Sequence, residues 1–448
     1  MKKEDTHAFQ QKPGRTVLLL TLPVLGSALA EPMTSLVDTG FVATLGSTSS
    51  NALAIATTIL SGAFWMLNFI GIGIQTLAAG AHGQDDKDLL HRRIGTALVM
   101  ATALSFAMIF LYPFLDAIAG LMGADGELKQ ITVDYMRIRL LGAPAVLVGF
   151  AAFGALRGVQ DMRTPLYVAV GINALNIALD PLMIFGIGPF PVMGVSGAAW
   201  ASVISQWLGL AWVFAALRKK VGFRLCVDLP TLNYLLATGR DMFIRTGSLT
   251  LFLALATRKA TLASEQTAAA HQAIRQLWFF TALLLDAYAV VGQSLVAYFI
   301  ARENKSLARK AAAQTILWSV GSGFLVGILL LIIKEPAIAL LTPKDAAHLL
   351  AGTWSAWFIS SICQPLNGLC FATDGVHWGT GDYGFMRNSV VLATLGGIIG
   401  LYLIDPSAEN YLRHIWLVCV YTIILRGVLG LLRIWPGFGR APLGSRNG

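Results

Sequence analysis

The sequence predicts an all-α polytopic membrane protein with twelve transmembrane helices in two pseudo-symmetric six-helix bundles. Three observations lead to this fold class: composition, repeated apolar runs, and an internal repeat of about 220 residues. Of the 448 residues, 56% are hydrophobic and 13% are charged, and the mean hydropathy is +0.66. A soluble globular chain carries roughly 25% charged residues, so this chain cannot cover a water-exposed surface of its size.

The apolar runs define the predicted spans in chain order, because each is long enough to cross a bilayer as a helix. They cover residues 15–42, 51–80, 94–121, 131–157, 165–188, 194–217, 233–257, 266–300, 311–333, 346–373, 388–404 and 410–432. The polar N-terminus and the length of the first run indicate a chain inserted without a cleavable signal peptide.

The basic residues predict the orientation. With the N-terminus inside, the inner segments hold 21 Lys and Arg residues and the outer loops hold six. The positive-inside rule then places both termini in the cytoplasm. A net charge of +9 therefore needs no nucleic-acid partner.

Two pairs of loop segments indicate a repeat. The loops after the second and eighth spans match at an offset of 218, and those after the fourth and tenth match at 221, through Lys87 and Lys305, and Asp161 and Asp382. We expect an N-lobe at 1–217, a cytoplasmic linker at 218–232 and a C-lobe at 233–448. An even number of spans per lobe makes the repeat parallel, a design often used for alternating access. Chance similarity between short polar loops is the alternative.

Several function classes lack their motifs in this sequence. It contains no Walker A segment, no G-x-S-x-G, no H-E-x-x-H and no Cys/His metal pattern. Its four cysteines show no redox or metal spacing and are read as small apolar fillers. We therefore expect no enzyme activity, no cofactor and no bound metal.

The first span contains two prolines, Pro23 and Pro32. Proline removes a backbone donor and bends a helix, and such breaks are tolerated in membranes where they face protein or a cavity. These residues are candidate hinges, with ordinary packing as the alternative.

Acidic residues at bilayer depth usually face a cavity and usually have a function. Asp38 lies in the first span, and Asp180 lies in the fifth, one helical turn after Asn176. Buried carboxylates that lie close together can bind and release a proton near neutral pH, so the pair predicts a proton-coupling site. The alternatives are a span-end carboxylate for Asp38 and a structural hydrogen bond between Asn176 and Asp180.

The second half carries its own charges within or near its spans. They are Asp241, Arg245, Arg275, Asp286 and Asp374. Arg245 follows Asp241 by four residues, which allows an ion pair within one helix. We read the set as a structural charge network rather than a coupling site.

The sequence resembles the multidrug and toxic compound extrusion (MATE) family, and within it the DinF branch. The resemblance covers nearly the whole chain. It is carried in order by "LVDTGFVATLG", "AAGAHGQDD", "GALRGVQDMRTPLYV", "NALNIALDPLMIFGIG", "GRDMFIRT", "LLDAYAVVGQ" and "DGVHWGTGDYGFMRNS". The ordered set is specific, although each segment alone is weak.

The resemblance implies two six-helix bundles that export cytoplasmic compounds in exchange for H⁺ or Na⁺. Asp38 falls on the family's first-helix carboxylate, Asn176 and Asp180 on its fifth-helix partners, and Ser202 where relatives often carry Thr. Asn367 stands where the sodium-coupled branch has an acidic residue, which favours H⁺. Thr34 stands where some DinF relatives carry Tyr, which leaves the details of the network open.

The leading functional prediction is a cation-coupled antiporter for small organic compounds, often cationic. Its cavity would include Asp38, which could attract a cationic substrate, and the walls Phe64, Met66 and Phe153, since aromatic and Met side chains hold varied ligands loosely. An organic-anion exporter and a flippase for a lipid-linked substrate are the alternatives. We expect the chain in the bacterial cytoplasmic (inner) membrane, and the resemblance implies that a monomer can work alone.

Overall fold

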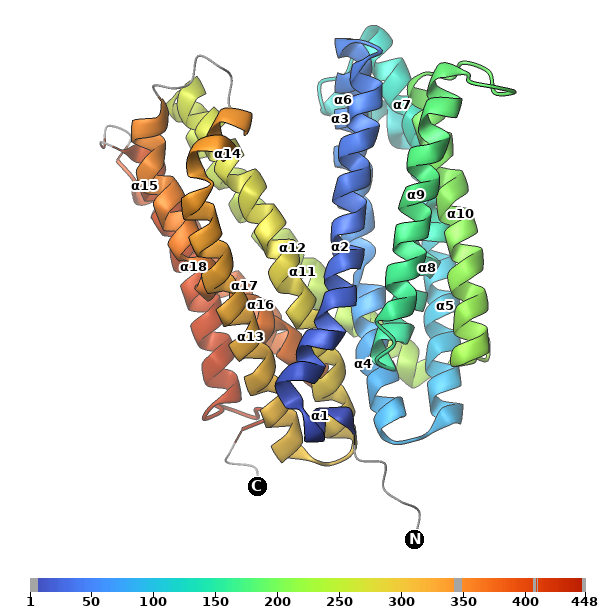
Figure 1. Cartoon of the computed structure of the whole chain (residues 1–448), viewed down its shortest axis with the longest axis vertical. Coiled ribbons are helices and arrows are strands. Elements are labelled where there is room, and N and C mark those ends of the chain that lie inside the picture. The colour runs from blue at the N-terminus through green and yellow to red at the C-terminus, as the bar shows by residue number, and fades with distance from the viewer. Residues whose placement is uncertain (1–6, 342–348, 406–407, 409, 445–448) are drawn as a thin grey trace. The chain divides into compact units, whose positions relative to one another are not determined.

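The structure, a computed structural model, describes residues 7–341, 349–405, 408 and 410–444, which form helices joined by short loops (Figure 1). Packing divides the chain into an N-terminal unit, Pro23–Gly239, and a C-terminal unit, Met1–Leu22 with Arg240–Gly448. The predicted lobes were defined by membrane spans, and their limits stay a prediction.

The N-terminal unit holds most of the helices from the first half of the chain. They are α3 (Ser47–Leu67), α4 (Phe69–Gly83), α5 (Lys87–Ile109), η1 (Tyr112–Phe114), α6 (Leu115–Leu121), α7 (Gly126–Leu140), α8 (Ala143–Gly158), α9 (Arg163–Phe185) and α10 (Val195–Lys220). Two long helices, α2 (Pro13–Ala43) and α11 (Leu229–Ala263), each contain a boundary between the units.

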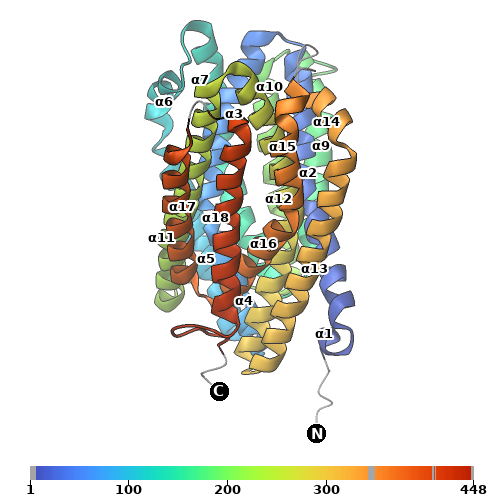
Figure 2. The same ribbon diagram turned by 90° about the vertical axis from the view of Figure 1, so that its left-hand side faces the viewer.

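The C-terminal unit begins with the short α1 (Ala8–Gln11) and the start of α2. Within this unit α18 packs against α15, α16 and α17 (Figure 2). Its other helices are α12 (Glu265–Ala301), α13 (Lys305–Ile332), α14 (Lys334–Leu341), α15 (Leu349–Ile362), α16 (Gln364–Thr380), α17 (Tyr383–Leu403) and α18 (Tyr411–Ile434).

The predicted fold class is confirmed. Within the described residues, nine helical segments are long and apolar enough to cross a membrane, and the bent pair α7 and α8 makes a tenth if it is one span. The charged α11 and the pair α15 and α16 correspond to the two remaining predicted spans. The first residues of predicted span 346–373 lie outside the described residues.

Several predicted spans consist of more than one helix. Span 131–157 becomes α7 and α8, whose axes differ by 48°. Pro144 lies in the first turn of α8, where its missing N–H and its ring prevent α7 from continuing. Similarly, Pro113 lies in η1, just after α5 ends. A window of apolar residues cannot separate such helices from one long span.

The segment that follows α10 packs along α5. Thr96 on α5 donates to the carbonyl of Cys226 at 3.1 Å and accepts from the backbone N–H of Asp228 at 3.0 Å. A Cβ atom on Gly95 would lie 1.7 Å from the carbonyl oxygen of Arg224, so only glycine permits this approach. The predicted linker is therefore fixed to the N-terminal unit over these residues.

Helices α4 and α8 approach each other closely through glycine. A Cβ atom on Gly154 would lie 2.2 Å from the carbonyl oxygen of Gly71, and one on Gly158 would lie 2.7 Å from that of Gln75. Small residues allow this backbone approach between membrane helices. The contact locks two helices of the N-terminal unit together.

The C-terminal unit repeats this contact between α12 and α16. A Cβ atom on Gly375 would lie 2.3 Å from the carbonyl oxygen of Ala289, and one on Gly379 would lie 2.6 Å from that of Gln293. The glycines follow those of α8 by 221 residues, and their acceptors follow those of α4 by 218. The offsets found in the loops therefore extend to helix packing inside each unit.

We expect Gly154→Ala to destabilise the protein by about 1–3 kcal/mol, because a methyl group would overlap the α4 backbone. Gly149→Ala is the matched control on the same helix, since nothing lies within 4 Å of its Cβ position. Chemical denaturation in mixed micelles measures both variants. Equal stability of the two variants would contradict this account of the packing.

Candidate functional site

Asp38, Asn176 and Asp180 come together inside the N-terminal unit. Asp38 lies on α2 and is half-buried, whereas Asn176 and Asp180 lie one turn apart on α9 and are 4% and 0% exposed. The four-residue spacing places both α9 side chains on one helix face. Residues separated by about 140 positions in the chain thus share one buried site.

The amide of Asn176 links this site to α10. The amide nitrogen and oxygen are assigned so that each faces a suitable partner. In this orientation the nitrogen donates to Asp38 Oδ1 at 3.2 Å, and the oxygen accepts from the backbone N–H of Ser202 at 3.2 Å. The four residues predicted from the sequence as coupling residues therefore lie together at one site. Their role in coupling stays a prediction.

The carboxyl groups of Asp38 and Asp180 lie close enough to act on each other electrostatically. Both oxygens of Asp180 are buried without a donor from the described residues. Two ionised carboxylates offer acceptors only, so a hydrogen bond between them requires a proton on one of them. One proton placed between the two groups would give Asp180 the hydrogen bond that it otherwise lacks.

Sequence reasoning missed a second layer of this site. Arg139 on α7 lies within electrostatic reach of Asp38 and of the buried Tyr135, one turn earlier on the same helix. Its Nη1 donates to Gln206 Oε1 on α10 at 2.9 Å. The sequence did contain a signal for this residue, because Arg139 is a cation within the predicted span 131–157 and lies four residues after Tyr135. Arg139 offers the carboxyl pair a fixed positive neighbour.

The predicted hinge and wall residues are placed as follows. Pro23 and Pro32 lie within the continuous helix α2, and Pro23 is the first residue of the N-terminal unit. Phe64 is buried in the apolar core of this unit. Met66 and Phe153 are half-buried on α3 and α8. Hinge motion and substrate contact stay predictions for all five.

Three of the five predicted charges of the C-terminal unit lie in two clusters. On α11, Asp241 pairs with Arg387 of α17 at 2.7 Å and with its neighbour Arg240 at 2.9 Å. Arg245, one turn further, bonds instead to Asp374 of α16, which also accepts from Arg426 of α18 at 2.8 Å. Apart from Arg240, the partners of Asp241 and Arg245 thus come from other helices.

The other two predicted charges lie on α12. The guanidinium of Arg275 donates to Gln272 Oε1 at 2.9 and 3.1 Å. Asp286 is half-buried further along this helix. The structure therefore brings Asp374 and Arg245 together and places Asp241 in a neighbouring cluster.

A loop carboxylate is tied to the end of the sixth predicted span. Asp161 accepts from Lys220 Nζ at 2.8 Å, from Thr164 Oγ1 at 2.6 Å and from the Thr164 backbone N–H at 3.0 Å. Asp382, its repeat equivalent, accepts from Arg433 at 2.8 Å at the end of α18. Burial alone would raise the pKa of Asp161, but the bonds from Lys220 and Thr164 outweigh it and hold the pKa below its usual range.

We expect Asp161→Asn to lower stability by about 1–2 kcal/mol near neutral pH, because charge-assisted hydrogen bonds are lost. Because the pKa of Asp161 is lower in the folded state, its contribution to stability is fully present above the unfolded-state pKa of about 4. This contribution disappears as pH falls through the folded-state pKa. Unfolding midpoints of wild type and variant should therefore converge in acid. A difference between the two midpoints that stays constant with pH would contradict the charge of Asp161 as the source of this stability.

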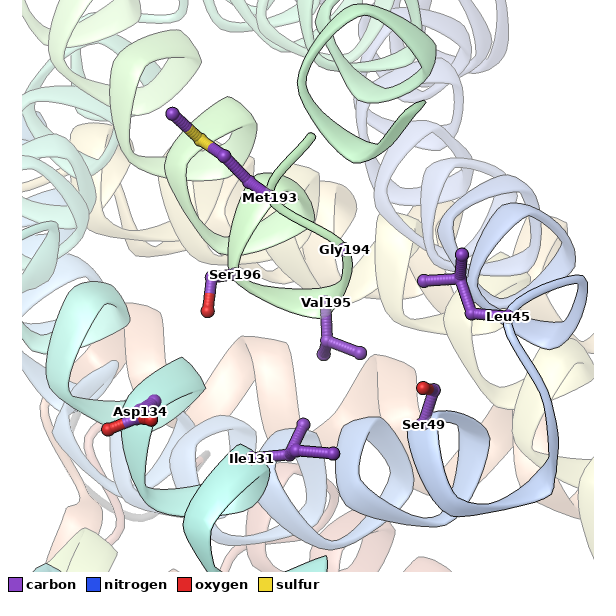
Figure 3. A pocket seen from close by; sticks show the side chains of 8 residues that line it. All are labelled: Leu45, Ser49, Ile131, Asp134, Met193, Gly194, Val195 and Ser196. Carbon is purple, nitrogen blue, oxygen red and sulfur yellow. The ribbon is translucent and has the colours of Figure 1, made fainter. Parts of the chain in front are cut away.

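Two surface hollows lie in the N-terminal unit, away from the carboxyl pair. One, of about 340 Å³, opens at the end of α2 and the start of α10, with Ser49, Asp134 and Ser196 around it (Figure 3). The other, of about 520 Å³, lies beside Asp161, Lys220 and His91. Asp38, Asn176, Asp180 and Ser202 line neither hollow.

Among the described residues, no group of three or more His, Cys, Asp or Glu side chains could hold a metal ion. The four cysteines are free thiols, and three of them are buried. The site is thus made of carboxyl, amide and guanidinium groups.

A helical membrane fold with paired carboxyl groups between its spans is the architecture of a polytopic transporter, and comparisons with known proteins identify which kind. The MatE family model matches residues 23–182 and 248–403, more than half of the chain. The chain belongs to the MATE family of membrane transporters, and the resemblance found in the sequence is confirmed.

Relatives span nearly the whole chain. Protein DETOXIFICATION 44, chloroplastic, of Arabidopsis thaliana is 30% identical over 94% of this chain and 82% of its own length. DNA damage-inducible protein F of Escherichia coli (strain K12) is 30% identical over 96% and 93%. An outward-facing structure of a multidrug resistance MATE family transporter superposes with a TM-score of 0.86 at 20% identity, covering 94% of each chain.

Proposed function

We propose that this chain is a proton-coupled antiporter that exports amphipathic or cationic organic compounds by alternating access. The observation that carries the proposal is that Asp38, bonded to Asn176, lies within electrostatic reach of Asp180, whose two buried oxygens have no donor among the described residues. A proton can be exchanged for a positive charge carried by a substrate, because each removes one unit of negative charge from the same carboxyl pair.

The exchange would proceed through the polar network around the pair. When the proton leaves, two carboxylates face each other and repel, so the site attracts a cation. When a proton returns, the negative charge of the pair falls from two units to one, so its attraction for a cation weakens. The bond from Asn176 then keeps Asp38 in position. Arg139 would tune this competition, since its positive charge acts on Asp38. Competition for one site is sufficient to couple the two fluxes.

The orientation of the chain, its membrane and its oligomeric state are also part of the proposed function. The charge distribution favours both termini in the cytoplasm, and we place the chain in a bacterial cytoplasmic membrane. The family resemblance supports a monomer as the working form.

Purified protein in liposomes tests the coupling ion. An imposed pH gradient without sodium should drive efflux of a fluorescent organic cation, and dissipating the gradient with a protonophore should stop it. A sodium gradient at equal pH should drive no efflux. Transport that needs sodium and ignores the pH gradient would overturn proton coupling.

A further inference from the structure

Two arginines share one carboxylate within the helices of the C-terminal unit. Arg245 of α11 and Arg426 of α18 both donate through Nη2 to the same oxygen, Oδ2, of Asp374 on α16. The side chains of the three residues are 10%, 8% and 8% exposed. One negative charge against two positive charges leaves this cluster with a net charge of about +1, at a depth where unpaired charge is unfavourable.

Three side chains that the structure describes beside the cluster do not balance this charge. On α16, the imidazole of His377 bonds to the carbonyl of Gly430 at 3.1 Å, and Cys370 lies within electrostatic reach of both arginines. The ring of Trp378 lies 5.8 Å from the Arg245 guanidinium carbon. None of these three side chains supplies a full negative charge.

The next carboxylates along these helices are already paired. On α11, Asp241 is bound by Arg240 and Arg387. Asp382, which acts electrostatically on His377, is bound by Arg433 at 2.8 Å. The cluster that contains Asp241 also holds two arginines for one carboxylate, so it adds positive charge to this side of the unit.

The arginines also keep unused donors. The Nε atoms of Arg245 and Arg426 are both buried without a partner from the described residues. A guanidinium offers five N–H donors in a fixed fork suited to anions. A water molecule could accept from these donors, but it could not balance the charge.

We propose that Arg245, Arg426 and Asp374 form a binding site for a small anion, a halide or a carboxylate, which accepts from the free guanidinium N–H groups. The anion would neutralise the cluster, while Asp374 holds the two guanidiniums in place. This site goes beyond the proposed function and lies in the other packed unit from the Asp38 site. It can be tested by binding alone, without any transport measurement.

The test uses full-length protein purified in a buffer whose only anion is a bulky sulfonate. Sodium bromide and sodium acetate are titrated separately at constant ionic strength, and the thermal unfolding midpoint is recorded. A ligand that binds only the folded state raises this midpoint with its concentration. We expect saturable stabilisation by at least one of the two salts, and the effective salt identifies the site as halide- or carboxylate-binding.

Variants locate the effect. Arg426→Lys keeps the charge but removes the planar fork, so the apparent anion affinity should fall about 10-fold or more. Arg137→Lys is the control, because Arg137 pairs with Asp134 at a half-exposed site in the other unit. If Arg426→Lys does not fold, bromide anomalous scattering from crystals of the wild type replaces it, with a peak expected beside both Nε atoms.

Three results would overturn the site. They are equal stabilisation by the sulfonate and both test anions, an unchanged anion affinity in Arg426→Lys, and bromide peaks in the crystal that lie elsewhere. Failure of the transport experiment would leave this binding result standing, so the two proposals are tested separately.

Discussion

Asp38→Asn should reduce gradient-driven efflux to the level of protein-free liposomes. An amide does not ionise, so the site would lose one of its two negative charges and could no longer share a proton between two carboxyl groups. The nearly equal size of the two side chains should leave the Asn176 contact and the fold intact. The measurement is efflux of a fluorescent organic cation under a pH gradient, with thermal unfolding as the check on folding.

Asp134→Asn is the matched control for this experiment. Asp134 lies in the same unit, but it pairs with Arg137 and with Gln130 at the surface of α7. It should transport at the wild-type rate. Full gradient-driven efflux in Asp38→Asn would remove Asp38 from the coupling step.

Asp374→Ala should destabilise the protein by about 3–5 kcal/mol, because it leaves the guanidiniums of Arg245 and Arg426 buried without their shared partner. Removing one arginine as well, in Asp374→Ala with Arg426→Met, should recover part of this loss. Chemical denaturation in mixed micelles gives the free energies of unfolding for the single and double variants.

Asp116→Ala provides the comparison, since Asp116 is 66% exposed and pairs with Lys129 at 2.6 Å on the surface. Exposed pairs contribute about 0–1 kcal/mol. A loss of that size in Asp374→Ala would show that the buried cluster does not depend on its carboxylate.

Much of the fold could be predicted from the sequence because membrane spans have a simple physical signature. Twenty apolar residues cross the bilayer as a helix, so the runs marked the helices, and the loop offsets of 218 and 221 also held for the glycine contacts of Gly154 and Gly375. The divisions at Pro144 and Pro113 were missed because hydropathy windows average over a break.

The candidate site was less accessible to sequence reasoning. Asp38 and Asp180 stood out because carboxylates are rare in apolar runs. Arg139, Tyr135 and Gln206 did not, since their role depends on which faces of α7 and α10 meet.

Long-range pairing had the same difficulty. Local spacing suggested Arg245 as a partner for Asp241, yet the structure pairs Asp241 with Arg387, 146 residues away. Spacing along one helix shows only which side chains share a face of that helix. Ion pairs also form with side chains of every other helix that packs against it.

The central claim is that Asp38 and Asp180 share a proton, and infrared spectroscopy tests it most directly. Purified wild-type protein at neutral pH should show the carbonyl stretch of a protonated, hydrogen-bonded carboxyl group, and this band should be absent from Asp180→Asn. A band of equal strength in the two proteins would mean that the proton resides elsewhere. No such band in the wild type would mean that both carboxyl groups are ionised, and the proposed exchange of a shared proton for a cationic substrate would be wrong.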